Sequence, residues 1–484
     1  MVSIPPGWIE TQALSLLSQM GFDASSYPAR NPVRVTGDAP SFDTHHRIVE
    51  ASAISLVAYA TAVDCFWQEK RGKAQKLSVD LLQAAAAIYP VRYQKQNGYP
   101  MPLLPGAELA QDFFQTRDGR WFYPVASYPH LRNRTLEILD CANTKVALGR
   151  VIARREADAL EALFAAHKIP AAYVRTRSEW RAHPQGRILA GIPAVQIRRI
   201  GEAPYAAPAS SPSRPLADLR VLDFSHVIAG PVAARTLAEH GADVLRISAP
   251  HQPDPLVQIM DTGIGKRTAF LDIRNAADLG KLKDLCRSAD VFVDSWRPGV
   301  LAKHGLTPEQ LSAIQPNLIY VTINTFGPHG PWADRGGFEQ IGQLVSGICH
   351  TEGRGGRPRL VPTHFLNDYL TGYLAAAGVV AALHRRQREG GSYHVTASLT
   401  QTSMWVQSLG EVAPENTTVN PFEIAPVLER RASPFGMLEQ LPPVVGFSET
   451  PPCWELPPHP LGSHLPVWRD QDETARCVEA ECSI

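Results

Sequence analysis

The sequence has no excess of either charge, since 47 lysines and arginines balance 47 aspartates and glutamates among its 484 residues. A zero balance gives no electrostatic reason to expect nucleic acid or an anionic membrane as the main partner. Long apolar runs are also missing: one of the longest, Leu374–Leu383, is too short to span a bilayer. We therefore expect a protein that binds neither nucleic acid nor membrane.

Cysteine is scarce and does not occur in a paired pattern. The seven cysteines are an odd number and include no C-x-x-C pair. This usage disfavours a disulfide framework or a zinc site and is typical of reduced intracellular thiols. The opening residues Met1–Gly7 lack the basic region and apolar core of a secretory signal. We therefore expect a cytoplasmic protein without a metal.

Apolar residues, in contrast, are plentiful at 44% of the chain, and the length predicts two or three domains. One stretch, residues 203–216, is dominated by proline, alanine and serine and has the composition of a linker. We place the main boundary there, with one part at residues 1–202 and another at 217–410. The tail, residues 411–484, is proline-rich and is expected to run over the surface as extended segments.

After the linker, short apolar strands alternate with helices. The expected strands are residues 220–224, 242–247, 289–293 and 318–323, and the expected helices are 232–239, 277–288 and a segment that starts at 308. Alternation with nearly continuous apolar strands predicts an α/β fold with a doubly wound, mostly parallel, Rossmann-like sheet.

The chain also contains a candidate internal repeat. Leu56–Ala85 and Leu374–Met404 each run from an alanine-rich helix through a charged turn into a strand. Gly72 aligns with Gly390, Leu81 with Leu399 and Gln83 with Gln401, all at the same offset in residue number. A single offset maintained through helix, turn and strand favours a duplication.

Several short loops after apolar segments carry residues suited to binding phosphate. In His226–Pro231, Gly230 and Pro231 favour a tight turn into a helix. The start of that helix would present free N–H groups at the carboxyl edge of the sheet, where nucleotide phosphates bind. Lys266 and Arg297 suit phosphate contact or ordinary surface charge. The region has no G-x-G-x-x-G or Walker motif, so a nicotinamide or ATP site has little support.

Two acids are candidates for catalysis. Asp368 lies at the start of the alanine-rich helix, where a carboxylate can be an N-terminal cap or an ionised nucleophile. Glu339 is a second acid with an ordinary surface alternative. His226 and His364 have no acid–base partner at a suitable spacing, so no Ser-His-Asp triad is indicated.

Taken in order, these segments resemble the family III CoA-transferases (the CaiB/BaiF family). The similar segments are Leu219–Pro231, Gly241–Arg246, Gly265–Asp272, Ala289–Gly299, Asn317–Gly330 and Asp368–Gly372. The resemblance implies the family's fold and an enzyme that moves CoA from an acyl-CoA to a carboxylic acid. It also implies an interlocked dimer, so this chain is expected to form a homodimer or an internal pseudo-dimer.

The resemblance implies a role for each matching position. Asp368 corresponds to the family's nucleophile, which forms a mixed anhydride and then an aspartyl-CoA thioester, and Glu339 corresponds to an acid near the reacting centre. The positions that correspond to CoA contacts are His226, Ala229, Lys266, Trp296, Arg297 and Lys303. The implied coenzyme is CoA, as part of the substrate, with no metal or redox cofactor.

Residues 1–202 resemble the second half of the same family. The resemblance lies at Asp118–Trp121, Ile169–Val174 and Glu179–Gly186, so a second half precedes a first half. At the offset of the repeat, Asp368 aligns with Glu50, which lacks the following Thr-Gly. We interpret residues 1–202 as a degenerate, non-catalytic copy.

Two alternatives stay open. The first is an acyl-CoA racemase or a hydratase-like enzyme of the same fold, although Phe338 stands where the racemases have a histidine. The second is an inactive CoA-binding scaffold. Three departures from the family favour it: Ile228 in place of the glutamine of formyl-CoA transferases, Ser248 in place of a glutamate, and no Gly-Gly-Gly run after Asp368.

Overall fold

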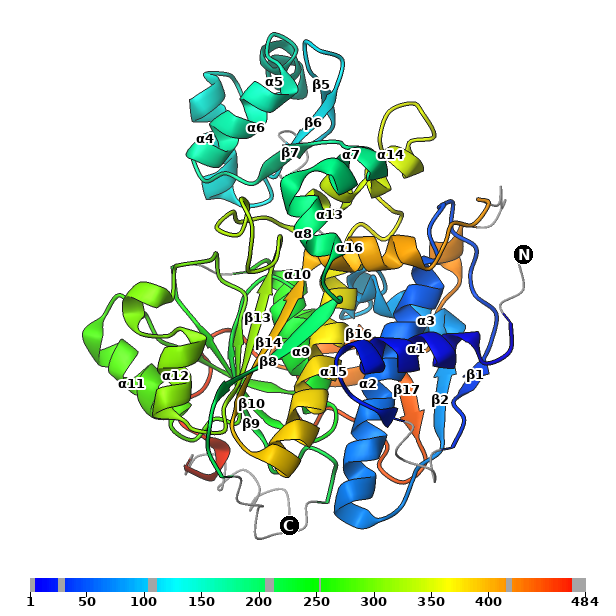
Figure 1. Cartoon of the computed structure of the whole chain (residues 1–484), viewed down its shortest axis with the longest axis vertical. Coiled ribbons are helices and arrows are strands. Elements are labelled where there is room, and N and C mark those ends of the chain that lie inside the picture. Colours follow the sequence, from blue (N-terminus) through cyan, green and yellow to red (C-terminus); the bar gives the residue numbers. More distant parts are fainter. Residues whose placement is uncertain are drawn as a thin grey trace.

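The computed structural model describes residues 5–24, 31–102, 111–204, 213–251, 254–414 and 420–471. Most of the linker-like stretch, Cys477, Cys482 and the first four residues lie outside the described residues. The structure is built around a seven-stranded sheet in the order β11-β10-β9-β12-β13-β14-β8 (Figure 1). Its strands are β8 (Val195–Gly201), β9 (Arg220–Phe224), β10 (Asp243–Ser248), β11 (Lys266–Phe270), β12 (Val291–Asp294), β13 (Ile319–Asn324) and β14 (Ser392–Ser398).

All neighbouring strands of this sheet pair in parallel except β8, which pairs antiparallel with β14. The predicted mixed α/β fold with a mostly parallel sheet is confirmed. The antiparallel edge comes from before the linker-like stretch, so the part at 1–202 contributes directly to the main sheet.

Alternate strand residues face opposite helical layers, which explains the nearly continuous apolar strands. Val221 and Val321 belong to the core that contains α9 (Ala229–Ala238) and α15 (Leu366–Glu389). Leu222 and Phe292 belong to the core on the other face. That face is covered by α11 (Ala276–Cys286) and α12 (Pro308–Ile314).

The first hundred residues pack against α15. Their elements are α1 (Trp8–Gln19), β1 (Arg34–Thr36), α2 (Ile48–Arg71), β2 (Leu77–Asp80), α3 (Leu81–Ala87), β3 (Lys95–Gln96) and β4 (Tyr99–Pro100). By length and composition α2 could cross a membrane, but 94% of its most apolar stretch is buried inside the molecule. Core packing against α15 therefore accounts for its apolar composition.

Residues 111–190 form a lobe beyond the carboxyl end of β13 (Figure 1). It contains β5 (Phe114–Gln115), β6 (Trp121–Pro124), α4 (Pro129–Leu139), α5 (Lys145–Ile152), α6 (Ala157–Ala166), β7 (Ala171–Tyr173), α7 (Arg177–Ala182) and α8 (Pro184–Ala190). Trp180 and Leu189 of this lobe share a buried cluster with Leu344 of α13 (Glu339–Ser346). This apolar contact holds the lobe formed by residues 111–190, hereafter the amino-terminal lobe, against α13.

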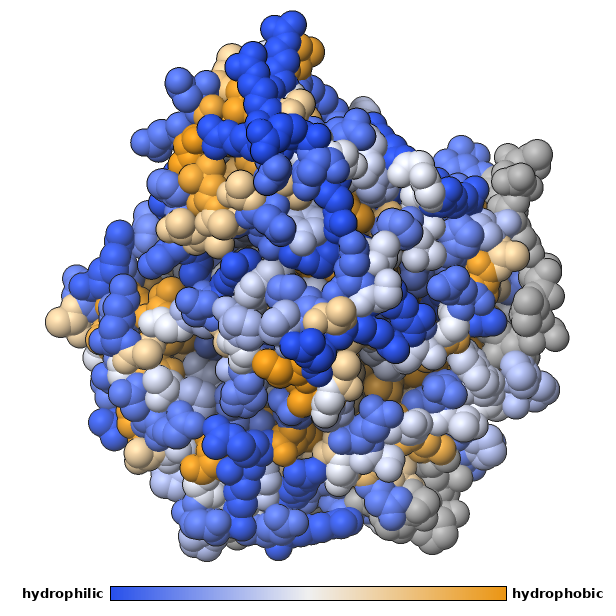
Figure 2. Space-filling model, turned by 45° about the horizontal axis from the view of Figure 1, so that its top comes forward, coloured by the Kyte–Doolittle hydropathy of each residue, from blue (hydrophilic) through white to orange (hydrophobic). Residues whose placement is uncertain are grey.

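The remaining helices are α10 (Leu256–Thr262), α14 (Ile348–Glu352) and α16 (Leu399–Ser408). The tail forms more regular structure than the expected extended segments. Its hairpin, β15 (Glu429–Ser433) and β16 (Gly436–Gln440), pairs with β3, and β17 (Val445–Phe447) pairs with β2. The surface in Figure 2 is mostly hydrophilic and is interrupted by small apolar patches, one of them on the amino-terminal lobe.

Candidate active site

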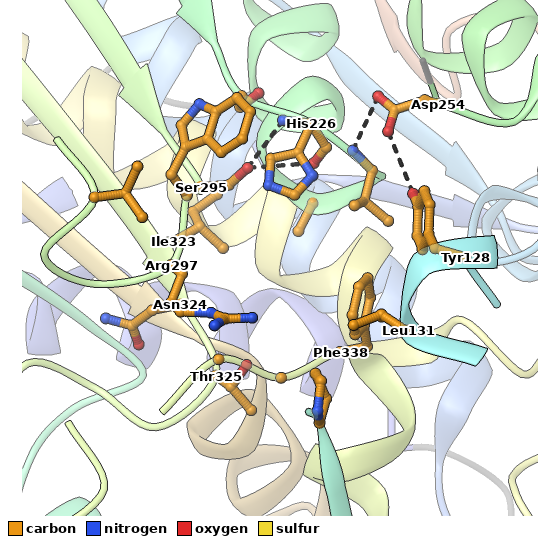
Figure 3. A pocket seen from close by; sticks show the side chains of 18 of the residues that line it. Tyr128, Leu131, His226, Asp254, Ser295, Arg297, Ile323, Asn324, Thr325 and Phe338 are labelled. Atoms are coloured by element: carbon orange, nitrogen blue, oxygen red, sulfur yellow. Dashed lines mark hydrogen bonds between the residues drawn. The ribbon is translucent and has the colours of Figure 1, made fainter. Parts of the chain in front are cut away.

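A cavity of about 600 Å³ opens at the carboxyl end of the sheet. One wall is formed by the loops that follow β9, β12 and β13, and the amino-terminal lobe forms another with Tyr128–Leu131 and Pro170 (Figure 3). Of the residues predicted from the sequence, His226, Ala229, Trp296, Arg297 and Asp368 line this single cavity. Five residues from three separate segments therefore meet where parallel α/β sheets bind their ligands.

Asp368 is the third residue of α15 and is only 6% exposed. Close packing of α15 on α9 brings it to the cavity. A Cβ atom at Gly372 would lie 2.6 Å from Val232 Cγ1 and 2.8 Å from the carbonyl oxygen of Ala229. Only glycine permits this approach, which explains the Thr-Gly that follows Asp368 in the sequence.

Glu339, the first residue of α13, contacts the start of α15. The backbone N–H of Asp368 donates to Glu339 Oε2 at 3.1 Å, and the Gln343 amide donates to the other carboxylate oxygen. Glu339 is 1% exposed and is absent from the cavity lining. It therefore positions the start of α15 and does not face the cavity.

The two acids are electrostatically coupled. Burial raises the pKa of Asp368 from its usual value to about 7. Burial and the nearby charge of Asp368 raise the pKa of Glu339 well above its usual range. Because like charges this close disfavour double ionisation, Glu339 keeps its proton while Asp368 ionises near neutral pH. The site thus presents one carboxylate able to act as a nucleophile.

The start of α9 supplies a second feature of the site. The first N–H groups of a helix have no partner within the helix, and the first residue of α9, Ala229, lines the cavity. Together with the positive end of the helix dipole, they can stabilise a negatively charged oxygen.

An aromatic pair lines the adjacent wall. The rings of His226 and Trp296 lie 4.5 Å apart, and the Trp296 indole N–H donates to the Phe224 carbonyl at 2.9 Å. Asp294 accepts the backbone N–H of Trp296 at 2.8 Å and the hydroxyl of Tyr320 at 3.1 Å. Trp296 is therefore held in one orientation, and burial lowers the pKa of His226, which favours the neutral imidazole.

Two predicted CoA contacts lie elsewhere. Lys266 is the first residue of β11 instead of a loop cation, and it is 1% exposed. Its ammonium donates to Asp223 at 2.6 Å and to the Pro231 carbonyl at 2.7 Å, beneath the start of α9. Lys303 is exposed on the turn Ala302–His304 and does not line the cavity. Direct CoA contact by either lysine stays a prediction.

Tyr128 and Asp254 were not among the residues predicted from the sequence. Asp254 accepts hydrogen bonds from the Tyr128 hydroxyl at 3.3 Å and the Val227 N–H at 3.1 Å (Figure 3). Arg246 pairs with the same carboxylate at 2.5 Å. Val227 has a φ of 67°, a strained conformation for a β-branched residue, and Asp254 stabilises it. Neither residue belongs to a local motif, so no sequence signal marked them.

A buried carboxylate beside a helix start at the carboxyl edge of an α/β sheet is an arrangement suited to covalent group transfer. A model of the CoA-transferase family III matches residues 216–425. An acetyl-coenzyme A transferase from Hypoxylon pulicicidum is 29% identical and covers 84% of this chain and 70% of its own length. The chain is therefore similar to CoA-transferase family III over residues 216–425.

Other relatives match over a shorter part. The beta subunit of the succinyl-CoA–L-malate CoA-transferase from Chloroflexus aurantiacus is 34% identical over 39% of this chain and 50% of its own length. A crystal structure of a CaiB/BaiF family protein from Brucella suis is 27% identical, covers 46% of this chain and 65% of its own, and has a TM-score of 0.38. The chain thus spans about half the length of several curated relatives that it matches.

Proposed function

We propose that this protein transfers CoA from an acyl-CoA thioester to a carboxylic acid, with Asp368 as the covalent nucleophile. The observation that carries this proposal is the buried carboxylate of Asp368, whose pKa is raised to about 7, in a cavity at two helix starts. The match of residues 216–425 to CoA-transferase family III and the names of the relatives support the reaction class.

The reaction proceeds through balanced acyl exchanges. A carboxylate oxygen of Asp368 attacks the thioester carbonyl carbon, the C–S bond breaks, and CoA leaves as the thiolate. The product is a mixed anhydride between Asp368 and the acyl group. The thiolate then attacks the Asp368 carbonyl carbon, which releases the first acid as a carboxylate and leaves an aspartyl-CoA thioester.

An acceptor carboxylate reverses these steps. Its oxygen attacks the aspartyl-CoA carbonyl, the thiolate leaves, and a second anhydride forms. Attack of the thiolate on the acceptor carbonyl yields the new acyl-CoA and restores the Asp368 carboxylate. No net proton or electron is consumed, so the residues need only position the partners and stabilise oxyanions.

The charge of the cavity orients the substrate. Arg297 lies in the cavity lining and contacts the amino-terminal lobe, and the positive end of α9 faces the same space. These groups suit the phosphates and the thioester oxygen of an acyl-CoA, while Trp296 and His226 offer flat surfaces for apolar and aromatic parts.

The structure is compatible with a duplicated origin of the chain. The helices α2 and α15 both contain 24 residues, and α2 starts at Ile48 as α15 starts at Leu366, at the offset of the repeat. They pack against each other. We include an internal pseudo-dimer in the proposal, and a cytoplasmic location and a homodimer stay predictions.

A racemase is less well supported, because Phe338 lies at the cavity where a proton-transferring histidine would be needed. An inactive scaffold would not need a buried nucleophile. Mass spectrometry of the protein after incubation with butyryl-CoA and acid quenching tests these readings. We expect a CoA or acyl adduct on the peptide that contains Asp368, and no adduct on Asp368→Asn. CoA binding without any adduct would contradict the proposed transferase.

A further inference from the structure

The wall of the cavity beside the nucleophile is apolar and comes from two parts of the chain. Tyr128 and Leu131 belong to the amino-terminal lobe, and Phe338 comes from the loop before α13 (Figure 3). The Tyr128 and Phe338 rings stack 5.7 Å apart at an interplanar angle of 29°. Phe338 precedes Glu339, the acid that binds the backbone N–H of Asp368, so this wall adjoins the nucleophile.

The two arginines of the cavity lining each contact another group of the protein. The Arg297 guanidinium donates to the carbonyl of Lys168 at 3.0 Å, and the Arg335 guanidinium lies over the Trp332 ring, 4.2 Å from its centre. Among the described residues, no hydrogen bond or ion pair joins the Asp368 carboxylate to a cation, and burial raises its pKa. A second substrate carboxylate would therefore find no positive partner beside Asp368.

The wall is held rigidly in place. Asp254 accepts the Tyr128 hydroxyl and pairs with Arg246, which links the amino-terminal lobe to β10. The same carboxylate holds the strained Val227, which also lines the cavity. Tyr128 thus cannot turn aside easily to admit a charged group, because it would leave a buried carboxylate with one partner fewer.

We propose that this protein acts on acyl groups that end in uncharged hydrocarbon, and that the wall formed by Tyr128, Leu131 and Phe338 rejects acyl groups with a second carboxylate. This inference rests on the proposed function and names its substrate class. A hydrocarbon end gains from burial against these rings. A carboxylate end loses its hydration without a compensating partner and also faces the charge of Asp368. The acceptor acid occupies the same space and obeys the same restriction.

Butyryl-CoA and succinyl-CoA provide a matched test, because both acyl groups have four carbons and differ in a terminal methyl or carboxylate group. Each is incubated with its own isotopically labelled free acid, and the entry of label into the acyl-CoA is measured. This exchange requires no knowledge of the natural acceptor. We expect kcat/KM for butyryl-CoA to exceed that for succinyl-CoA by at least about 100-fold.

Equal exchange with both substrates would overturn the substrate class while leaving the transferase intact. Absence of exchange and of an Asp368 adduct with every acyl-CoA would instead contradict the proposed function. Phe338→Ala shortens the wall and is expected to raise the octanoyl-to-butyryl ratio of kcat/KM about tenfold, with succinyl-CoA still rejected. Val146→Ala, on an exposed position of the same lobe, is the control and leaves the ratio unchanged. An unchanged ratio in Phe338→Ala would refute the role of the wall.

Discussion

Replacement of Asp368 by asparagine should stabilise the protein while it abolishes transfer. In the folded protein the pKa of Asp368 is raised from 3.8 to about 7 by burial. The folded state therefore keeps a proton that the unfolded chain loses at lower pH. The stabilising contribution of the neutral acid is complete below about pH 4 and is lost as pH rises to about 7.

The size of this effect follows from the shift. A little over three pKa units correspond to roughly 4 kcal/mol at about 1.36 kcal/mol per unit. About two of these units fall between pH 5 and pH 8, or roughly 3 kcal/mol. An unfolding entropy of about 2.1 cal/mol/K per residue converts that energy into about 3 °C for a chain of this length.

Thermal unfolding of wild type and Asp368→Asn at the two pH values measures the difference. We expect the Tm of Asp368→Asn relative to wild type to increase by about 3 °C between pH 5 and pH 8. Asp284→Asn, at a side chain that is 74% exposed, serves as the control and should show no such pH-dependent change. A Tm difference for Asp368→Asn that is independent of pH would refute the claim that this carboxylate is buried and perturbed.

Three further predictions concern the surroundings of the nucleophile. The transfer rate should rise through about pH 7 as Asp368 ionises. Glu339→Gln should retain that midpoint because Glu339 already holds its proton. A midpoint displaced by a full pH unit in this variant would contradict the assignment of the proton to Glu339. Gly372→Ala should separate α15 from α9, lower the free energy of unfolding by about 1–3 kcal/mol and reduce kcat. The control Gly280→Ala should be tolerated, because its Cβ would lie in open space. Equal changes of Tm in the two variants would argue against the packing explanation. Lys266→Met should lower the free energy of unfolding in urea by about 3–5 kcal/mol, because it leaves the buried Asp223 carboxylate without its ion pair. A raised KM for the acyl-CoA without lost stability would instead indicate that Lys266 contacts CoA directly.

The strands β9, β10, β12 and β13 could be predicted because each carries its own signal. Arg220–Phe224 is apolar over most of its length, follows a linker-like stretch and precedes a helix that begins with Ala-Gly-Pro, and all of these features are local. The place of Asp368 at a helix start could be predicted for the same reason, whereas its role as a nucleophile was implied by the resemblance and stays a prediction.

Contacts between distant segments could not be predicted. Tyr128 reaches the site from a different lobe, and its contact with Asp254 depends on how the two parts pack. Lys266 was interpreted as a loop cation because its partner, Asp223, lies on another strand. β9 and β11 both pair with β10, and this arrangement depends on the whole sheet, so no local sequence pattern predicts it.

The most direct test of the central claim follows oxygen atoms from the acid to Asp368. In the proposed sequence, an acid labelled with ¹⁸O in both carboxylate oxygens leaves one of them on Asp368 when its acyl group is transferred to CoA. Turnover followed by proteolysis and mass spectrometry should therefore show ¹⁸O in the peptide that contains Asp368, with one labelled atom after a single turnover. Transfer with no label in that peptide would contradict a covalent role for Asp368.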